Sequence, residues 1–277
     1  MTRLDLSTGV AVVTGAASGI GRATALALTG RGCALALADR DADGLAEAAA
    51  ACRERGVTVS EHVLDVADAD ALAALPEAVL GEHGRVTLVV AAAGVSLLGR
   101  FEEATMEEIR WLIEINLFGT IGLVKGFLPA LQREPAAHVV TISSLFGIIA
   151  PAEQTAYAAS KFGVRGFSES LRHELAGGTV GVTVVHPGGV KTAIARNARV
   201  AAGADADAQT TMSQRFERTF LRTPAEPVGE AIVRAAERRR PRLVVASGAR
   251  LGVALQRLLP VRYWRVLGIG FDRISGR

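Results

Sequence analysis

The chain has 277 residues and a formal net charge of +3, and 49% of its residues are apolar while only 5% are aromatic. That length allows one large α/β domain or two small ones. No uncharged apolar run of about 18 residues is present, so no membrane-spanning helix is expected. No signal peptide is expected either, because Asp5 interrupts the start. Cys33 and Cys52 lack the spacing of a metal or redox site, so we expect buried thiols, a cytoplasmic location and no metal.

Strand-like and helix-like patterns alternate along the whole chain. The predicted strands are Val10–Thr14, Cys33–Ala38, Val57–Leu64, Val86–Ala91, His138–Ile142, Val182–His186 and Leu243–Ala246. The predicted helices are Gly19–Arg31, Ala42–Arg55, Ala69–His83, Thr105–Ile115 and on toward Gln132, Ala156–Ala176 and Pro224–Arg239. Uninterrupted Val, Ile, Leu and Ala runs are typical of strands covered on both faces. The alternation therefore predicts a doubly wound parallel sheet with helices on both faces, a Rossmann-like α/β fold.

The domain organisation follows from the same pattern. Residues 1–248 are predicted to form a single Rossmann-like domain, followed by a helical, basic and amphipathic extension over 249–277. Residues 193–225 are predicted to be a long irregular insertion that acts as a mobile lid.

A glycine-rich turn joins the first predicted strand to the first helix, with Gly15, Gly19 and Gly21 in the spacing G-x-x-x-G-x-G. Glycines there let the backbone approach a pyrophosphate, and the helix N-terminus supplies free N–H groups. Asp39 ends the second strand, where a carboxylate can accept hydrogen bonds from both adenosine ribose hydroxyls and would repel a 2′-phosphate. We therefore expect NAD, with NADP as the alternative because Arg40 could pair with that phosphate.

Tyr157 precedes Lys161 by four residues, which on a helix places the phenol and the ammonium on one face. A neighbouring cation lowers the pKa of a phenol from its usual value of about 10, toward the range useful for a general base. Ser144 follows the predicted strand that ends at Ile142, where its hydroxyl could bind a substrate oxygen. The Tyr/Lys spacing alone also fits an aromatic ring packed on a lysine stem, so the other motifs must decide.

Together these residues resemble the short-chain dehydrogenase/reductase family over about residues 8–192. The resemblance adds three motifs to the two above: Asp65-Val66, Asn116 in I-N-L-F-G, and the segment from Pro187 to Thr192. The loop chemistry and the resemblance together imply cofactor contacts from Thr14, Gly15, Ser18, Gly19, Ile20, Gly21, Asp39, Arg40, Asp65, Val66, Ala92, Gly94, Tyr157, Lys161, Pro187, Gly188, Val190 and Thr192. The implied catalytic residues are Asn116, Ser144, Tyr157 and Lys161, and the implied substrate contacts are Ser144, Phe146, Tyr157 and Gly189.

The resemblance implies an NAD(P)-dependent oxidoreductase that interconverts a secondary alcohol and its ketone. Tyr157 would be the acid and base, Ser144 would bind the reacting oxygen, Lys161 would lower the phenol pKa and bind the nicotinamide ribose, and Asn116 would position a water molecule. The family also implies a homodimer or homotetramer. The alternatives are an NADPH-dependent carbonyl reductase and, in another class, a non-catalytic dinucleotide-binding scaffold or sensor.

A hydrophobic substrate is predicted because the residues around the site are mainly apolar. The expected pocket wall includes Leu145, Phe146, Ile148 and Ile149, with Ile194, Met212, Phe216 and Phe220 added by the lid. One departure from the family pattern lies after the fourth strand, where Ala91-Ala92-Ala93-Gly94 replaces an asparagine-containing motif. The missing amides put the rigidity of the central sheet and the strength of cofactor binding in question.

The C-terminal quarter carries the basic character of the chain, because residues 215–277 have a net charge of +9 and the rest has −6. Leu251, Leu255, Leu258 and Leu259 share one predicted helical face, and Val261, Trp264, Leu267 and Phe271 a second, with arginines between them. Three interpretations remain open: the segment covers the protein's own core or a neighbour's cleft, it rests on an anionic membrane, or it contacts acidic partners. Nucleic acid is not expected, since no recognised binding module accompanies the arginines.

Overall fold

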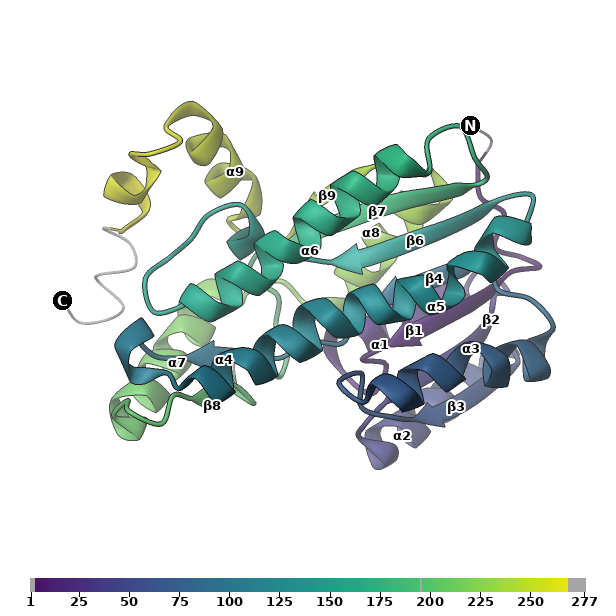
Figure 1. Cartoon of the computed structure of the whole chain (residues 1–277), viewed down its shortest axis with the longest axis horizontal. Helices are drawn as coiled ribbons and strands as arrows, with labels where there is room; N and C mark the ends of the chain where they lie inside the picture. Colours follow the sequence, from purple (N-terminus) through teal and green to yellow (C-terminus); the bar gives the residue numbers. More distant parts are fainter. Residues whose placement is uncertain (1–2, 195, 269–277) are drawn as a thin grey trace.

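The computed structural model describes residues 3–194 and 196–268, and its centre is a seven-stranded parallel sheet with helices on both faces (Figure 1). The strand order is β3-β2-β1-β4-β6-β7-β9. The strands are β1 (Val10–Thr14), β2 (Ala34–Asp39), β3 (Val59–Val63), β4 (Leu88–Ala91), β6 (Ala137–Ile142), β7 (Val180–Pro187) and β9 (Arg242–Val245). The predicted doubly wound α/β fold is confirmed. Because the order reverses between β1 and β4, a crevice is expected at the carboxyl ends of these two strands.

Helices cover both faces of this sheet, and a further helix follows β9 and projects from the body of the molecule (Figure 1). They are α1 (Gly19–Thr29), α2 (Ala42–Arg53), α3 (Ala69–His83), α6 (Thr155–Glu174), α8 (Ala225–Glu237) and α9 (Ala249–Leu258), with α4 (Met106–Ile113) and α5 (Gly119–Arg133) joined by a π-helical turn over Glu114–Phe118. A π-helical turn inside an α-helix is often found at functional sites, and here it holds Asn116.

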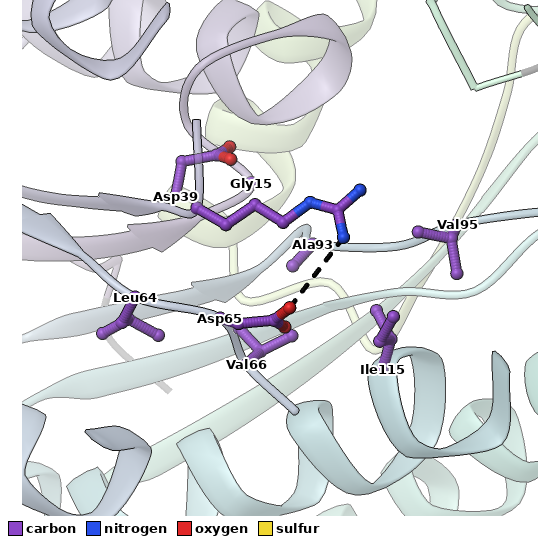
Figure 2. Close-up of a pocket in the computed structure, with 9 residues that line it drawn as sticks. Gly15, Asp39, Leu64, Asp65, Val66, Ala93, Val95 and Ile115 are labelled. Atoms are coloured by element: carbon purple, nitrogen blue, oxygen red, sulfur yellow. Dashed lines mark ion pairs between the residues drawn. The ribbon is translucent and has the colours of Figure 1, made fainter. Parts of the chain in front are cut away.

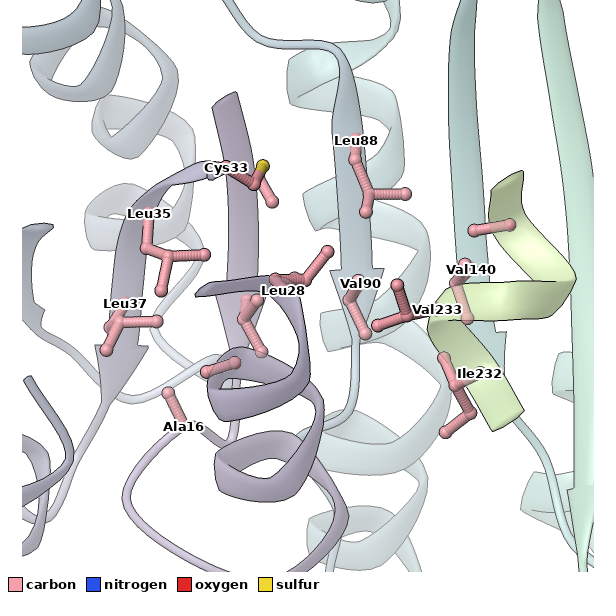
Figure 3. Close-up of a cluster of buried hydrophobic side chains, with 14 of the residues drawn as sticks. Ala16, Leu28, Cys33, Leu35, Leu37, Leu88, Val90, Val140, Ile232 and Val233 are labelled. Carbon is pink, nitrogen blue, oxygen red and sulfur yellow. The ribbon is translucent and has the colours of Figure 1, made fainter. Parts of the chain in front are cut away.

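Alternate residues of the strands point into two separate cores. On β1, Val13 belongs to the core that α1, α2 and α8 cover, and Val12 belongs to the core under α3, α5 and α6. Figure 3 shows the first core, in which Val233 of α8 lies against Val90 of β4. Burial on both sheet faces explains why these strands read as continuous apolar runs. Cys33 and Cys52 are buried and unpaired, as expected.

The insertion at 193–225 is not irregular, and that prediction was wrong. Its first part forms the short strand β8 (Arg199–Val200), which pairs with β5 (Leu97–Leu98), and its second part forms the helix α7 (Ala206–Phe220). The Arg199 guanidinium lies 3.9 Å from the centre of the Trp111 ring, and the backbone N–H of Ala202 donates to a carboxylate oxygen of Glu108 at 3.0 Å. These contacts bridge distant parts of the chain, so local composition did not reveal them. A lid function for α7 stays a prediction.

One helical run within the described residues, Met106–Arg133, is long and apolar enough to cross a membrane by length and composition alone. In this structure Leu123, Val124 and Phe127 of that run are packed in the second core against strands of the sheet. Burial within the protein thus accounts for these three apolar side chains of the run.

Candidate active site

In the glycine turn after β1, the backbone passes very close to the segment after β4 and to itself. Gly15 has φ +67° and Gly19 has φ +54°, a region that favours glycine. A Cβ at Gly15 would lie 2.7 Å from the backbone nitrogen of Ala93, and one at Gly21 would lie 2.0 Å from the carbonyl oxygen of Gly15. Ser18 makes no side-chain cap bond to α1, so the first N–H groups of α1 remain available to an anion.

Asp39 at the end of β2 is held in place by two backbone groups. Its Oδ2 accepts a hydrogen bond from the N–H of Ala17 at 3.0 Å, and its Oδ1 accepts one from the N–H of Asp41 at 3.1 Å. The first bond ties the carboxylate directly to the glycine turn. Asp39 therefore faces the place where a ribose would lie when a phosphate rests on the N-terminus of α1.

A cavity of about 60 Å³ opens beside this turn, between the ends of β1, β2, β3 and β4 (Figure 2). Its lining residues are Gly15, Asp39, Arg40, Leu64, Asp65, Val66, Ala93, Val95 and Ile115. The dashed line in Figure 2 marks the ion pair of 3.8 Å between Arg40 and Asp65. The structure thus brings together the predicted acidic, basic and apolar groups of an adenosine site.

Asn116 is completely buried and joins three parts of the chain. Its Oδ1 accepts from the N–H of Val95 at 2.8 Å, and its Nδ2 donates to the carbonyl oxygen of Val95 at 3.0 Å and to Ser160 Oγ at 3.1 Å. A Cβ at Gly94 would lie 3.2 Å from Asn116 Oδ1 and 3.3 Å from Lys161 Nζ. The asparagine therefore fixes the segment after β4 against α6, beside the lysine.

Ser144, Tyr157 and Lys161 converge where β6 ends and α6 begins. Ser144 and Tyr157 are hydrogen-bonded through their side chains, and Lys161 Nζ lies 5.7 Å from the centre of the Tyr157 ring. The Lys161 ammonium donates to the carbonyl oxygen of Ile142 at 3.1 Å. The ring of Phe146 meets that of Tyr157 edge to face, with the centroids 6.2 Å apart. The three predicted residues thus share one site.

The pKa values at this site differ from the prediction. Burial raises the pKa of Tyr157 to about 12, and the hydrogen bond with Ser144 acts in the opposite direction. Burial also lowers the pKa of Lys161 to about 8. We expected the lysine to lower the pKa of the phenol, but in this structure the loss of solvation outweighs any such effect, because a low-dielectric environment disfavours the charged form of both groups.

The segment from Pro187 to Thr192 begins at the last residue of β7 and is tightly enclosed. The backbone of Gly189 donates to the carbonyl oxygen of Ser247 and accepts from the N–H of Thr223. A Cβ at Gly189 would lie 1.8 Å from the carbonyl oxygen of Phe220. Thr192 lies against Gly19, since a Cβ there would be 3.2 Å from its methyl carbon. Gly188 lies against Ser247 and Ala249, and Val190 is buried in the first core. A substrate contact of the buried Gly189 stays a prediction.

The predicted substrate wall divides in the structure. Phe146 and Leu145 are half-buried, whereas Ile148 and Ile149 are buried in the packing beneath the loop. The side chains of Met212 and Phe216 lie outside the described residues. Ile194 and Phe220 are half-buried, and Phe146 is the predicted wall residue whose ring meets that of Tyr157.

Known proteins match this arrangement along most of the chain. The family model for short chain dehydrogenase matches residues 9–202. A putative oxidoreductase, SadH, of Mycobacterium tuberculosis is 41% identical over 263 residues, covering 94% of both chains. The chain belongs to the short-chain dehydrogenase family. Among solved structures, a short chain dehydrogenase/reductase from Burkholderia phymatum in complex with NAD is 31% identical, with a TM-score of 0.84 over 92% of this chain and 95% of that one.

A second solved relative bears on the cofactor. An alcohol dehydrogenase from the archaeon Thermococcus sibiricus, complexed with 5-hydroxy-NADP, is 29% identical, with a TM-score of 0.71 over 85% of this chain and 93% of that one. Family membership and the glycine turn after β1 together identify this short-chain dehydrogenase as an NAD(P)-dependent oxidoreductase. The glycine turn fits such a cofactor, because a Cβ at Gly15 would collide with the backbone of Ala93 and one at Gly21 with the carbonyl oxygen of Gly15, so glycine keeps the backbone bare where a pyrophosphate would lie.

The alanines at 91–93 leave the sheet of this short-chain dehydrogenase intact. Ala91 is paired with Thr14 of β1 and with Thr141 of β6, so the parallel ladder reaches the end of β4. After β4, the Asn116 side chain holds the chain in place through two hydrogen bonds with the backbone of Val95. The pairing of β4 is thus complete to Ala91, while the effect of the missing amides on the rigidity of the sheet and on cofactor affinity stays a prediction.

Two residues of the site were missed by the sequence analysis. Ser160 is buried between Asn116 Nδ2 and the carbonyl oxygen of Tyr157, to which it donates at 2.8 Å. His186 Nδ1 lies 3.0 Å from the carbonyl oxygen of Ser144 and so carries a proton, because a carbonyl can only accept. Neither residue had a signal in the sequence beyond its place next to a motif.

Proposed function

We propose that this protein interconverts a hydrophobic secondary alcohol and its ketone, with Tyr157 as the acid and base. The observation that carries the proposal is the joint position of Ser144, Tyr157 and Lys161 at the carboxyl edge of the sheet, beside the glycine turn. Bound NAD⁺ or NADH supplies the hydride acceptor or donor. The residues of this chain bind the substrate oxygen, hold the proton and exclude water.

Ser144 is the proposed anchor of the reacting oxygen. It begins the 3₁₀ turn Leu145–Gly147, and its Oγ accepts from the N–H of Phe146 at 3.0 Å, which fixes the orientation of the hydroxyl next to the phenol. A hydroxyl held this way can donate to a carbonyl or alkoxide oxygen. Asn116 is buried, and its amide binds Val95 and Ser160. We therefore assign it the role of positioning the segment around Gly94, which lies against Lys161.

The raised pKa of Tyr157, at about 12, bears on the direction of the reaction. A protonated phenol is the form that gives a proton to a forming alkoxide, so ketone reduction can start from this state. Alcohol oxidation needs the phenolate, which the positive charges of Lys161 and of an oxidised nicotinamide favour. This pKa supports the NADPH- or NADH-dependent carbonyl reductase as the second candidate function.

NAD is the proposed preferred cofactor. Asp39 is fixed toward the ribose position by Ala17 and Asp41, and a carboxylate there repels a 2′-phosphate. Arg40 is paired with Asp65 across the cavity, so it would have to leave this partner to bind such a phosphate. NADP remains the alternative that a direct titration of NADH against NADPH decides.

The substrate class and the assembly are proposed from exposed and half-buried apolar groups. Phe146 supplies an aromatic wall directly beside the phenol, which favours a bulky hydrophobic alcohol or ketone. Met106, Phe118 and Phe162 are exposed on the helical run around Asn116 and on α6. Large apolar side chains on neighbouring helices are typical of a subunit interface, so we propose a homodimer or homotetramer built on these helices.

The Tyr157→Phe variant tests the proposed acid and base. The substitution keeps the ring that packs on Phe146 and removes only the hydroxyl, so we expect turnover to fall about 10²- to 10⁴-fold while NADH binding, measured by fluorescence, stays unchanged. The matched control is Tyr263→Phe, the same change at the other tyrosine of the chain, which should stay close to wild-type turnover. If Tyr157→Phe kept more than about a tenth of the wild-type rate on a panel of secondary alcohols, the assignment would fail.

A further inference from the structure

The segment after β9 presents a surface that the proposed chemistry does not use. Leu251, Leu258, Val261 and Val266 are 63%, 76%, 88% and 50% exposed. Arg250, Arg257, Arg262 and Arg265 are exposed among them. We call these eight residues the basic apolar face. In Figure 1 the segment that carries it projects from the body of the molecule at one end.

The opposite side of the same segment is fastened to the protein, which is why the basic apolar face points outward. Ala249 is buried, and Gly252 of α9 lies so close to the loop after Ser144 that a Cβ would be 3.0 Å from the Leu145 side chain. The hydroxyl of Tyr263 accepts a hydrogen bond from the N–H of Ala150 at 2.9 Å. The predicted leucine face is therefore split: Leu251 and Leu258 face solvent instead of the core.

The charge of this surface is of one sign. Residues 249–268 contain four arginines and no acidic residue. Within the described residues, no ion pair is found for Arg250, Arg257, Arg262 or Arg265. The segment thus has leucines and valines between arginines without an ion pair, and Tyr263 and Trp264 are half-buried on it. This composition is typical of helices that lie in a membrane interface.

We propose that the basic apolar face binds the surface of an anionic lipid bilayer. Apolar side chains enter the boundary between headgroups and acyl chains, and the arginines meet lipid phosphates. A second copy of the chain fits less well, because a two-fold contact of this face with itself would oppose two sets of four arginines.

Binding in this orientation has a consequence for the active site. The residues that hold the segment, Leu145 and Ala150, belong to the loop that follows Ser144. A bilayer at the basic apolar face would then lie beside the loop that borders the reacting hydroxyl, and a lipid-like alcohol could reach it from the membrane. This last step rests on the proposed function, whereas the binding itself does not.

Sedimentation of the full-length protein with lipid vesicles tests the proposal. We expect the wild type to sediment with phosphatidylcholine vesicles that contain phosphatidylglycerol and not with phosphatidylcholine alone. Removing two interfacial arginines in Arg257→Gln/Arg262→Gln should lower the partition coefficient about 30-fold. The matched control Arg133→Gln/Arg238→Gln removes the same charge from exposed positions elsewhere and should bind like the wild type.

A second pair of variants separates apolar insertion from simple charge attraction. Leu258→Ser/Val261→Ser should lose most vesicle binding, while Val63→Ser, an exposed valine on β3, should not. Turnover on a water-soluble substrate should be unchanged in all of these variants, so a failure of membrane binding is distinguishable from a failure of the proposed function. The proposal would be overturned if the wild type stayed in the supernatant, or if the control variants lost as much vesicle binding as the test variants. A smaller oligomer in gel filtration of Leu258→Ser/Val261→Ser would also overturn it, in favour of a contact between copies of the chain.

Discussion

Replacing Asn116 by alanine probes the junction on which the active site is built. The side chain is completely buried and makes three hydrogen bonds, two with the backbone of Val95 and one with Ser160. Val95 follows Gly94, which lies against Lys161. The alanine variant should therefore lose both stability and the position of the segment that borders the cofactor and the lysine.

The magnitude follows from the groups left without partners. Removal of the amide leaves the N–H and the carbonyl oxygen of the half-buried Val95 without their side-chain partner, and each polar group left unsatisfied costs about 1–3 kcal/mol where water does not replace the bond. Ser160 keeps its bond to the Tyr157 carbonyl oxygen, so its loss is smaller. The free energy of unfolding should fall by about 3–5 kcal/mol.

Urea unfolding followed by circular dichroism measures this change, and NADH titration measures the loss of cofactor affinity. Ser160→Ala is the matched control: it removes one partner of the same amide and should cost about 1 kcal/mol. Asn116→Asp should be no better than alanine, because a carboxylate oxygen would then face the carbonyl oxygen of Val95. A loss below about 1 kcal/mol in Asn116→Ala would refute the reasoning, since the three bonds would then contribute little beyond what water supplies.

Two further predictions concern pH and cofactor choice. Burial lowers the pKa of His138 to about 3 and that of His186 to about 4, so both rings are neutral in the folded state and gain a proton on unfolding below about pH 6.5. Their stabilisation is complete above that pH and is lost as pH falls toward 4 and 3. The two histidines together should lower the free energy of unfolding by about 2.4 kcal/mol between pH 6 and pH 5. Urea unfolding at several pH values checks this, and His138→Asn should about halve their contribution. Asp39→Ala should reduce the preference for NADH over NADPH at least about tenfold in a direct titration, because the charge that repels the 2′-phosphate is gone; an unchanged preference would show that Asp39 does not set it.

The sheet and its cofactor turn could be predicted from the sequence because their signals are local. A strand covered on both faces must be apolar at every position, as Val10–Thr14 is, and a turn with positive φ at Gly15 and Gly19 requires glycine at those positions. The Tyr157 and Lys161 pair was predictable for the same reason, since four residues on a helix fix a shared face.

Other features depended on contacts between residues far apart in the chain. Arg199 contacts Trp111, and Tyr263 binds the loop after Ser144. Ser160 of α6 binds Asn116 of the π-helical turn only because the fold brings these two elements together. The direction of the Tyr157 pKa shift also belongs here, because it depends on how much water the surrounding elements exclude. Sequence by itself determined which groups are present and where along each element they stand; the tertiary structure decided their partners and their solvation, because both are set by packing among distant segments.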